Sequence, residues 1–261
     1  AFANGGVSTV QTSTFIVADL DGKPPLDFVV VPRGPNDTSL ALLINKSLPG
    51  QPVNIATTVA NLAMGRDGIG LPTIGRLDGD AYPDLLVPHV RSAFSDVDVL
   101  WGNPTVGSFT LPAQAVAAGN EPNSVAIADF NHDQCSDFAV AADESRSLHV
   151  YLQGCSPTGI GSRTFTPSAF FFGLPHYGPL GLIQADVNSD GPADLLMLDR
   201  HRGELIVMLG QGDGRFAIPL LFPVGAEPAY IATGDLDGDG RLDLAIANRF
   251  SPFITLLYQR P

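Results

Sequence analysis

The sequence predicts an all-β protein, a β-propeller of five blades with four antiparallel strands each, and three observations lead to this fold class. An acidic motif recurs five times within 261 residues. Short apolar stretches of strand length flank every copy, and no window shows the 3.6-residue period of an amphipathic helix. Aspartate, a turn and metal residue, occurs 23 times, whereas glutamate, a helix former, occurs four times. Tandem units of about 50 residues with four short strands are typical of propeller blades.

The acidic motif places short polar residues on alternate positions and ends with an aspartate. Its first positions, 49 to 57 residues apart, are Asp19, Arg76, Asp129, Asp186 and Asp235. The third positions are Asp21, Asp78, Asn131, Asn188 and Asp237. The fifth positions are Lys23, Asp80, Asp133, Asp190 and Asp239. The ninth positions are Asp27, Asp84, Asp137, Asp194 and Asp243. Sixteen of the 23 aspartates lie in these motifs, so most of the acidic charge belongs to them.

Each repeat contains four candidate strands in a fixed order. The first is the apolar stretch before the motif, as at residues 123–130, and the second starts at the ninth position, as at 137–141. The third follows after a short turn, as at 148–154, and a weaker fourth follows a glycine-rich turn, as at 216–225. A proline seven residues before the motif marks the entry turn in three repeats: Pro122, Pro179 and Pro228.

The whole chain, residues 1–261, is predicted to form a single five-bladed domain. The last repeat ends after its third strand, and the first is preceded by a spare polar stretch. We therefore expect residues near 5–13 to supply the missing fourth strand and to close the ring. The alternative is that the chain is a fragment of a longer propeller, typically one of seven blades.

The spacing of the motif is suited to calcium. Ca²⁺ takes six to eight oxygen ligands, and alternate residues of a tight loop can aim their side chains at one centre. Glycines at the fourth or sixth position permit the backbone that such a loop needs: Gly22, Gly79, Gly191, Gly238 and Gly240. An EF-hand is excluded because its twelfth position requires glutamate, and the twelfth positions here are Val30, Val87, Val140, Met197 and Ile246. Mg²⁺ is disfavoured because it prefers fewer protein ligands and more water.

The motif resembles the FG-GAP/VCBS family, a calcium-loop propeller repeat also found in integrin α-subunit heads. The segment from Gly234 to Asn248, GDLDGDGRLDLAIAN, carries the most specific resemblance, and the five copies extend it over almost the whole chain. The resemblance implies a propeller with Ca²⁺ in the loop between the first two strands of a blade. It also implies a secreted or cell-surface binding module, in some cases a lectin and in a minority a carbohydrate-active enzyme.

Two loops depart from the motif. Lys23 and Arg76 stand at ligand positions in the first and second loops, where a cation can pair with the carboxylates in place of a metal. We expect about three structural Ca²⁺ ions, in the loops that contain Asp129, Asn131, Asp133, Asp137, Asp186, Asn188, Asp190, Asp194, Asp235, Asp237, Asp239 and Asp243. We expect weak or empty sites at Asp19, Asp21, Asp27, Asp78, Asp80 and Asp84. The alternative is that a loop which has lost one ligand still binds.

The two cysteines are predicted to form a disulfide. The strands around them form a hairpin, and if its turn spans residues 143–147, paired positions sum to 290, as Cys135 and Cys155 do. Two free thiols are the alternative. A disulfide and calcium binding both favour a secreted or cell-surface location, because extracellular modules bind calcium at roughly 10⁻⁴–10⁻³ M.

Charge limits the possible partners. The net charge is −13 and the sequence has no basic run, which disfavours nucleic acid and anionic membranes, and no stretch is long and apolar enough for a membrane span. Half of the twelve arginines lie in the turns between second and third strands: Arg33, Arg91, Arg146, Arg200, Arg202 and Arg249. Because arginine suits carboxylate or phosphate, these turns are a candidate surface for an acidic glycan or peptide. Alternatively each arginine pairs locally with Asp37, Asp96, Asp143 or Asp199.

Three function classes remain open: a binding module for a glycan or an extracellular protein, a polysaccharide lyase or hydrolase with its site in a central funnel, and a structural scaffold. The sequence contains no nucleophile elbow, zinc-protease motif or phosphate loop, and the motifs absorb most acidic residues. The binding module is therefore preferred over the enzyme. Tyr177, in the turn at residues 173–181, is a candidate ligand contact, or else an aromatic packed against the blade edge.

Overall fold

The computed structural model describes residues 12–20, 22, 26–32, 39–46, 55–56, 61–63, 68–90, 95–103, 109–172 and 179–260. These residues form twenty β-strands and contain no helix, so the predicted all-β class is confirmed. In the part of the chain that the structure describes, there is consequently no helix with the length and apolar character needed to cross a membrane.

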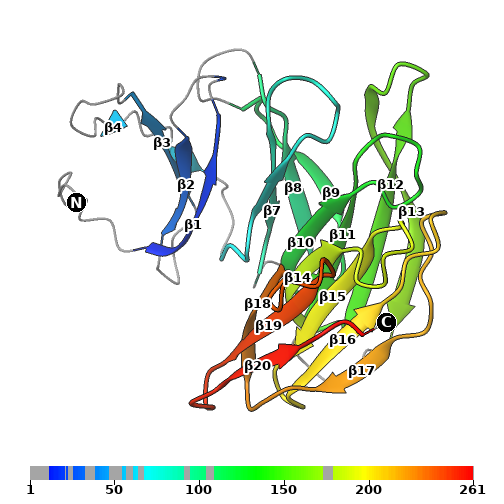
Figure 1. Ribbon diagram of the computed structural model, residues 1–261. Helices are drawn as coiled ribbons and strands as arrows, with labels where there is room; N and C mark the ends of the chain where they lie inside the picture. The colour runs from blue at the N-terminus through cyan, green and yellow to red at the C-terminus, as the bar shows by residue number, and fades with distance from the viewer. Residues whose placement is uncertain are drawn as a thin grey trace. The chain divides into compact units, whose positions relative to one another are not determined.

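The strands form five antiparallel sheets, the five blades of a β-propeller, in the predicted order (Figure 1). Blade one contains β1 (Thr12–Ala18), β2 (Asp27–Pro32), β3 (Ser39–Asn45), β4 (Ile55–Ala56) and β5 (Asn61–Ala63). Blade two contains β6 (Thr73–Gly75), β7 (Asp84–Pro88), β8 (Asp96–Leu100) and β9 (Gln114–Ala117). Blade three contains β10 (Pro122–Ala128), β11 (Asp137–Ala142), β12 (Ser147–Cys155) and β13 (Gly161–Phe172). Blade four contains β14 (Pro179–Ala185), β15 (Asp194–Asp199), β16 (Glu204–Met208) and β17 (Leu220–Pro223). Blade five contains β18 (Pro228–Gly234), β19 (Asp243–Asn248) and β20 (Ile254–Leu257).

The outer strand varies more than the other three. In blade one, the two short strands β4 and β5 pair with opposite ends of β3. Blade five has three strands among the described residues. The strand expected to complete it, near residues 5–13, falls mostly on residues 1–11, which lie outside the described residues, while Thr12 already begins β1. The closure of the ring stays a prediction.

The register of the first two strands is the same in every blade. The residue before the motif pairs with the ninth position in all five: Ala18 with Asp27, Gly75 with Asp84, Ala128 with Asp137, Ala185 with Asp194, and Gly234 with Asp243. Each acidic loop therefore spans eight residues between two paired strand ends. This shared register explains why the sequence motif has a fixed length.

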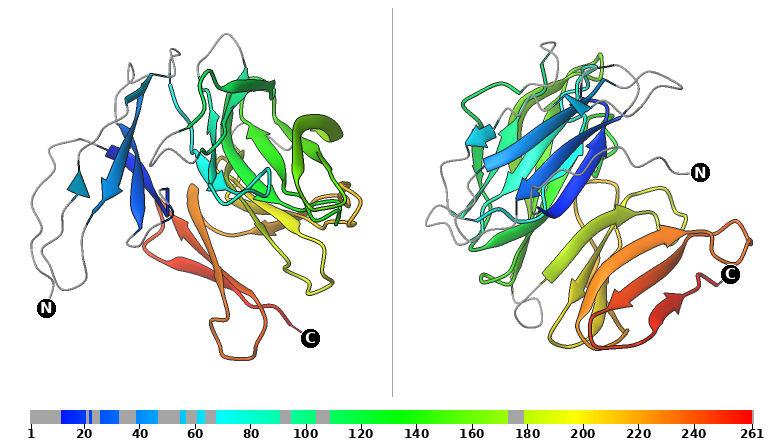
Figure 2. Two further views of the ribbon diagram at one scale, coloured as in Figure 1. Left: turned by 90° about the horizontal axis from the view of Figure 1, so that it is seen from above. Right: turned by 90° about the vertical axis from the view of Figure 1, so that its left-hand side faces the viewer.

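The chain divides into two compact units, each with its own stacked blades. Ala1–Arg76 with Asp80–Ala117 form one unit, and Leu77–Gly79 with Ala118–Pro261 form the other. In the first unit, the buried cluster of blades one and two joins side chains such as Leu42 and Val87. In the second unit, blade four packs against blade three on one face and against blade five on the other. Figure 2 shows blades four and five, in yellow to red, stacked side by side.

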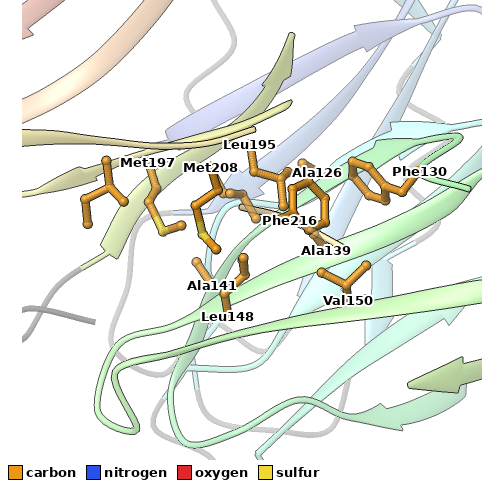
Figure 3. Close-up of a cluster of buried hydrophobic side chains, with 12 residues drawn as sticks. Ala126, Phe130, Ala139, Ala141, Leu148, Val150, Leu195, Met197, Met208 and Phe216 are labelled. Atoms are coloured by element: carbon orange, nitrogen blue, oxygen red, sulfur yellow. The ribbon is translucent and has the colours of Figure 1, made fainter. Parts of the chain in front are cut away.

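The interface between blades three and four is an apolar core. Alanines at 126, 139 and 141 leave room for the larger Met197 and Met208 of the facing sheet (Figure 3). Phe130 and Phe216 meet edge to face at its end, with their ring centroids 5.5 Å apart. The middle strands β11 and β15 are buried along their whole length. These second strands have continuous apolar sequences, and the acidic loops are anchored to their buried ends.

Candidate functional site

The acidic loops of blades three, four and five, which begin at Asp129, Asp186 and Asp235 and are called loops three, four and five, share one pattern of hydrogen bonds. We call this pattern the hydrogen-bond frame. The N–H of the fifth position donates to side-chain oxygens of both the first and the third position in each loop. For Asp133 the acceptors are Asp129 and Asn131, both at 3.1 Å. The same pairs in loop four are 3.1 and 3.2 Å long, and those in loop five are also 3.1 and 3.2 Å long. The frame turns side-chain oxygens of the first and third positions toward the backbone N–H of the fifth.

The backbone of these loops passes twice through the left-handed region. In loop five, Gly238 and Gly240 occupy the fourth and sixth positions, both with φ of 83°. The N–H of Gly240 then donates to the second oxygen of Asp235 at 2.9 Å. In loop three His132 and Gln134 take the same conformation, with φ of 58° and 75°, although it is unfavourable for residues with a Cβ. Loop five has glycine at both positions, as predicted. Loop three adopts the same backbone conformation without glycine.

The ninth-position aspartates have a structural role that the sequence did not indicate. All five are fully buried. In blades three to five, one oxygen accepts the N–H of the second loop position and the other accepts an N–H near or just past the end of the third strand. In blade four the two donors are Val187 and Gly210, each at 2.8 Å from the Asp194 oxygen that it contacts. The carboxylate thus fastens the loop to the end of the third strand.

Burial and like charge raise the affinity of these carboxylates for a proton. Burial raises the pKa of Asp137 to about 7, against the opposing N–H bonds from Gln153 and Phe130, and the nearby Asp133 and Asp129 carboxylates raise it further. Burial likewise raises the pKa of Asp194, with a further contribution from Asp190 and Asp186. A cation between the carboxylates would favour their ionised forms.

Loop five brings carboxylates together most closely. One oxygen from each of Asp235, Asp237 and Asp239 lies within 4.8 Å of the other two. Two ligands of one Ca²⁺ ion, each about 2.3–2.6 Å from it, can be at most about 5 Å apart, so the spacing and the oxygen donors fit calcium. Arg241 forms an ion pair with Asp239 at the edge of this group. A second grouping, of Asp133 with Cys135 and Cys155, does not fit a metal, because both sulfurs belong to a disulfide.

In loop two, a guanidinium contacts the acidic motif. Arg163, at the start of β13, pairs with the buried Asp78 and donates to it through Nε at 2.8 Å. The N–H of Gly161 also donates to the Asp78 carbonyl, at 3.0 Å. Arg76, the residue expected to act as the cation, has an exposed side chain. A cation that contacts Asp78 thus lies 85 positions away in the sequence, at Arg163.

Replacement of Arg163 by glutamine should leave the buried Asp78 carboxylate without its cation. We expect a loss of about 2 kcal/mol in calcium-free urea unfolding, discounted from the value for a fully buried pair because Arg163 is half exposed. The control is Arg163→Gln combined with Asp78→Asn, which should be closer to wild type; a double variant as unstable as the single one would contradict the ion-pair role.

Loop one is described only in part. Asp21 and Lys23 lie outside the described residues, so the expected pairing around Lys23 stays a prediction. Asp27 is buried and accepts the Leu20 N–H at 2.8 Å, as the ninth position does in other blades. The structural role of that position is thus present in a loop for which weak metal binding is expected.

The predicted disulfide is present. Cys135 and Cys155 are bonded, and their Cα atoms are 5.6 Å apart. The predicted register was wrong by one residue, because Phe138 pairs with Tyr151 and Ala142 with Ser147, which sum to 289. The turn is a four-residue one that closes through the Arg146 N–H and the Asp143 carbonyl, so it is one residue shorter than the sequence suggested.

The structure describes only some of the arginine-containing turns. Arg33, Arg91 and Tyr177 lie outside the described residues. Arg146 lies in the turn of blade three with φ of 49°. Arg200 follows β15, and Arg249 follows β19, where its N–H donates to the Glu227 carbonyl at 2.9 Å.

A buried polar chain lies beside the turn of blade three. Ser145 Oγ is 2.7 Å from Ser147 Oγ, which is 2.8 Å from His149 Nε2. A Cβ on Gly119 would lie 2.6 Å from that nitrogen, so only glycine fits there. Burial lowers the pKa of His149 to about 4, which keeps the imidazole neutral at neutral pH.

His149 should make the protein acid-sensitive. Its folded pKa of about 4 lies below its unfolded value of 6.5, so the unfolded state binds more protons between these values. Stability is lost as the pH falls through this window, by up to about 3 kcal/mol. His149→Asn, which keeps a partner for Ser147, should remove this part of the loss. Urea unfolding at pH 7, 5.5 and 4 measures it; equal slopes for the two proteins would contradict the assignment.

The comparisons with known proteins concern both the repeats and the fold. Residues 76–140 and 186–246 match the FG-GAP-like repeat. No curated protein matches the sequence significantly. A lectin from Agrocybe aegerita, described by its specific recognition of non-reducing terminal N-acetylglucosamine, is 19% identical with a TM-score of 0.59; the match covers 91% of this chain and 61% of the lectin chain. The chain therefore spans about three fifths of the length of that lectin.

Two further structures are similar at lower scores. The biofilm matrix protein Bap1 of V. cholerae is 16% identical with a TM-score of 0.48, over 91% of this chain and 35% of Bap1. A luciferin-regenerating enzyme is 14% identical with a TM-score of 0.48, over 92% of this chain and 75% of the enzyme. At these identities the likeness concerns the fold alone. The matching repeats lie within the five blades and include their acidic loops, so the chain contains FG-GAP-like repeats arranged as a β-propeller.

Proposed function

We propose that the protein is a secreted, calcium-stabilised binding module whose ligand is a glycan. The observation that carries the calcium proposal is the hydrogen-bond frame repeated in loops three, four and five. A frame that holds oxygens of the first and third side chains at the fifth residue, in a loop that ends in a buried ninth carboxylate, supplies the hard oxygen donors that calcium prefers. Without a cation, the same loops hold like charges close together.

The residues that would hold the ions are those of the motif. In loop five these are Asp235, Asp237, Asp239 and Asp243, and the corresponding residues serve in loops three and four. A bound Ca²⁺ would neutralise the carboxylates and cross-link the two strand ends of each loop. The chain itself contributes the rigid frame, because the fifth-position N–H holds the first and third side chains in place. The role proposed for the metal is structural.

The location outside the cell rests on the disulfide. Disulfides persist in oxidising compartments and are rare in the cytosol. The bond between Cys135 and Cys155 joins the end of loop three to the end of β12, so it secures one of the proposed calcium loops. Extracellular calcium, which is abundant, suits loops of moderate affinity. Both features support a protein that works after secretion.

The glycan proposal rests on the shared fold with the lectin that recognises N-acetylglucosamine. A propeller presents turns from neighbouring blades at one end of its strands, away from the acidic loops, and such turns can form ligand contacts on a rigid scaffold. The test is a glycan array probed with the calcium-loaded protein and, separately, with the protein in EDTA. We expect calcium-dependent binding to a limited set of glycans. Binding to no glycan, with calcium bound, would overturn the lectin proposal and favour a protein-binding or scaffold role.

A further inference from the structure

A cavity of about 590 Å³ lies at the turns of blades four and five, away from the acidic loops. One wall is the turn between β15 and β16, with Arg200, His201 and Arg202. The opposite wall is the link from β17 to β18, which includes Glu227. Phe250, in the turn that follows β19, lines the cavity and is 74% exposed. Cavities of this size hold small ligands.

The floor of the cavity is rigid backbone. A Cβ on Gly203 would lie 2.5 Å from the Gly225 carbonyl oxygen, and a Cβ on Gly225 would lie 2.6 Å from the Asn248 side chain. The Val224 N–H also donates to the Gly203 carbonyl at 2.8 Å. Glycine at both positions lets the two blades approach closely, so the cavity is formed before any ligand binds.

The arginines of this cavity form no local ion pairs among the described residues. One oxygen of Asp199 accepts the N–H groups of His201 and Arg202, both at 2.9 Å, so this carboxylate holds the turn instead of a guanidinium. Its other oxygen is buried and has no hydrogen-bond partner. The ion pairs that the structure gives to Arg163, Arg215 and Arg241 have no counterpart at Arg200 or Arg202 among the described residues. Local pairing, the alternative explanation of the arginine turns, therefore does not hold in blade four.

The chemistry of the walls favours an anionic sugar. Although the chain carries a net charge of −13, this cavity has two arginines and one histidine against one glutamate. Guanidinium groups recognise a carboxylate through two parallel hydrogen bonds. The exposed ring of Phe250 offers an apolar surface for the C–H face of a sugar.

We propose that this cavity is the glycan-binding site and that it takes a sugar bearing a carboxylate, with Arg200 and Arg202 binding the acid group and Phe250 packing on the ring. The proposal rests on the proposed lectin function and assigns its site and ligand class. Glu227, at the opposite wall, disfavours a second negative charge and so limits the ligand to one carboxylate near the arginines.

The test compares methyl glucuronide with methyl glucoside, which differ in having a carboxylate or a hydroxymethyl group at one carbon. Their dissociation constants are measured by NMR titration of the calcium-loaded full chain, together with an acidic tripeptide. We expect the glucuronide to bind about tenfold more tightly than the glucoside, and the preference to weaken at high salt. Arg200→Gln combined with Arg202→Gln should abolish the preference, whereas Glu227→Gln should strengthen glucuronide binding about threefold.

The control is Arg215→Gln, which removes one arginine charge from an exposed turn of the same blade and should leave both constants unchanged. Equal binding of glucuronide and glucoside, an unchanged preference in the double variant, or equally tight binding of the tripeptide would overturn the site assignment. If the double variant still binds the glycans of the array as the wild type does, the lectin function stands and only this site falls. If the wild type binds no glycan, the lectin function itself fails.

Discussion

Removal of calcium with EDTA is expected to lower the melting temperature by on the order of 20 °C. A ligand bound only to the folded state stabilises it by about 2.7 kcal/mol at a hundredfold excess over its dissociation constant, so three loops contribute about 8 kcal/mol. For a chain of 261 residues, each kcal/mol corresponds to about 2–4 °C. Calorimetry in calcium and in EDTA, with elemental analysis of the dialysed protein, measures both the shift and the number of ions.

The contribution of a single loop can be isolated by substitution. Asp239→Ala removes a fifth-position ligand and should lower the bound calcium by one ion and the calcium-dependent shift by about a third. Asp213→Ala is the matched control, because Asp213 is an exposed aspartate in a glycine-rich turn outside every motif, where it accepts the Arg215 N–H at 3.0 Å. Identical melting in calcium and EDTA, with no metal in the protein, would refute the proposed role of the acidic loops.

The architecture could be predicted from the sequence because its signals are local and repeated. A motif of fixed length sets the first hairpin of each blade, so five copies predict five blades without knowledge of long-range contacts. The positions of the two cysteines about the predicted hairpin turn of blade three also placed the disulfide correctly, although the register was wrong by one residue. There, Asp143 and Arg146 close a shorter turn than the spacing suggested, and turn length is not fixed by apolar alternation alone.

The parts that the sequence did not reveal depend on contacts between distant segments. Arg163 has no motif of its own, and only the packing of β13 brings it to Asp78. The sequence suggested Asp199 as an ion-pair partner for a neighbouring arginine. In the structure its carboxylate accepts backbone N–H groups of the turn instead. The sequence did contain a signal for the role of Asp199, because the side chain of an aspartate in a turn commonly accepts the backbone N–H two residues further on. No comparable local signal exists for the contact between Arg163 and Asp78.

The substitution Asp194→Ala should destabilise the protein strongly even without calcium. The carboxylate is fully buried, and its removal leaves the N–H groups of Val187 and Gly210 without acceptors. Each unsatisfied buried group costs about 1–3 kcal/mol, so we expect a loss of about 3–4 kcal/mol in urea unfolding measured in EDTA. Asp190→Ala, in the same loop, removes a more exposed carboxylate whose contacts lie within the loop, and in EDTA it should cost less than about 1 kcal/mol.

The pair of variants separates the two roles of the motif, because both residues belong to one proposed site and differ in their calcium-free contacts. In calcium, both should lose the stabilisation that the loop-four ion provides, so Asp190→Ala becomes destabilising only when calcium is present. Asp194→Ala should be destabilising in both conditions, and more so with calcium. If the two variants have equal free energies of unfolding in EDTA, the ninth position acts through the metal alone. The ninth position is aspartate in all five loops, including the two that carry Lys23 and Arg76. That pattern is expected if the carboxylate fastens the third strand to the loop whether or not an ion is bound.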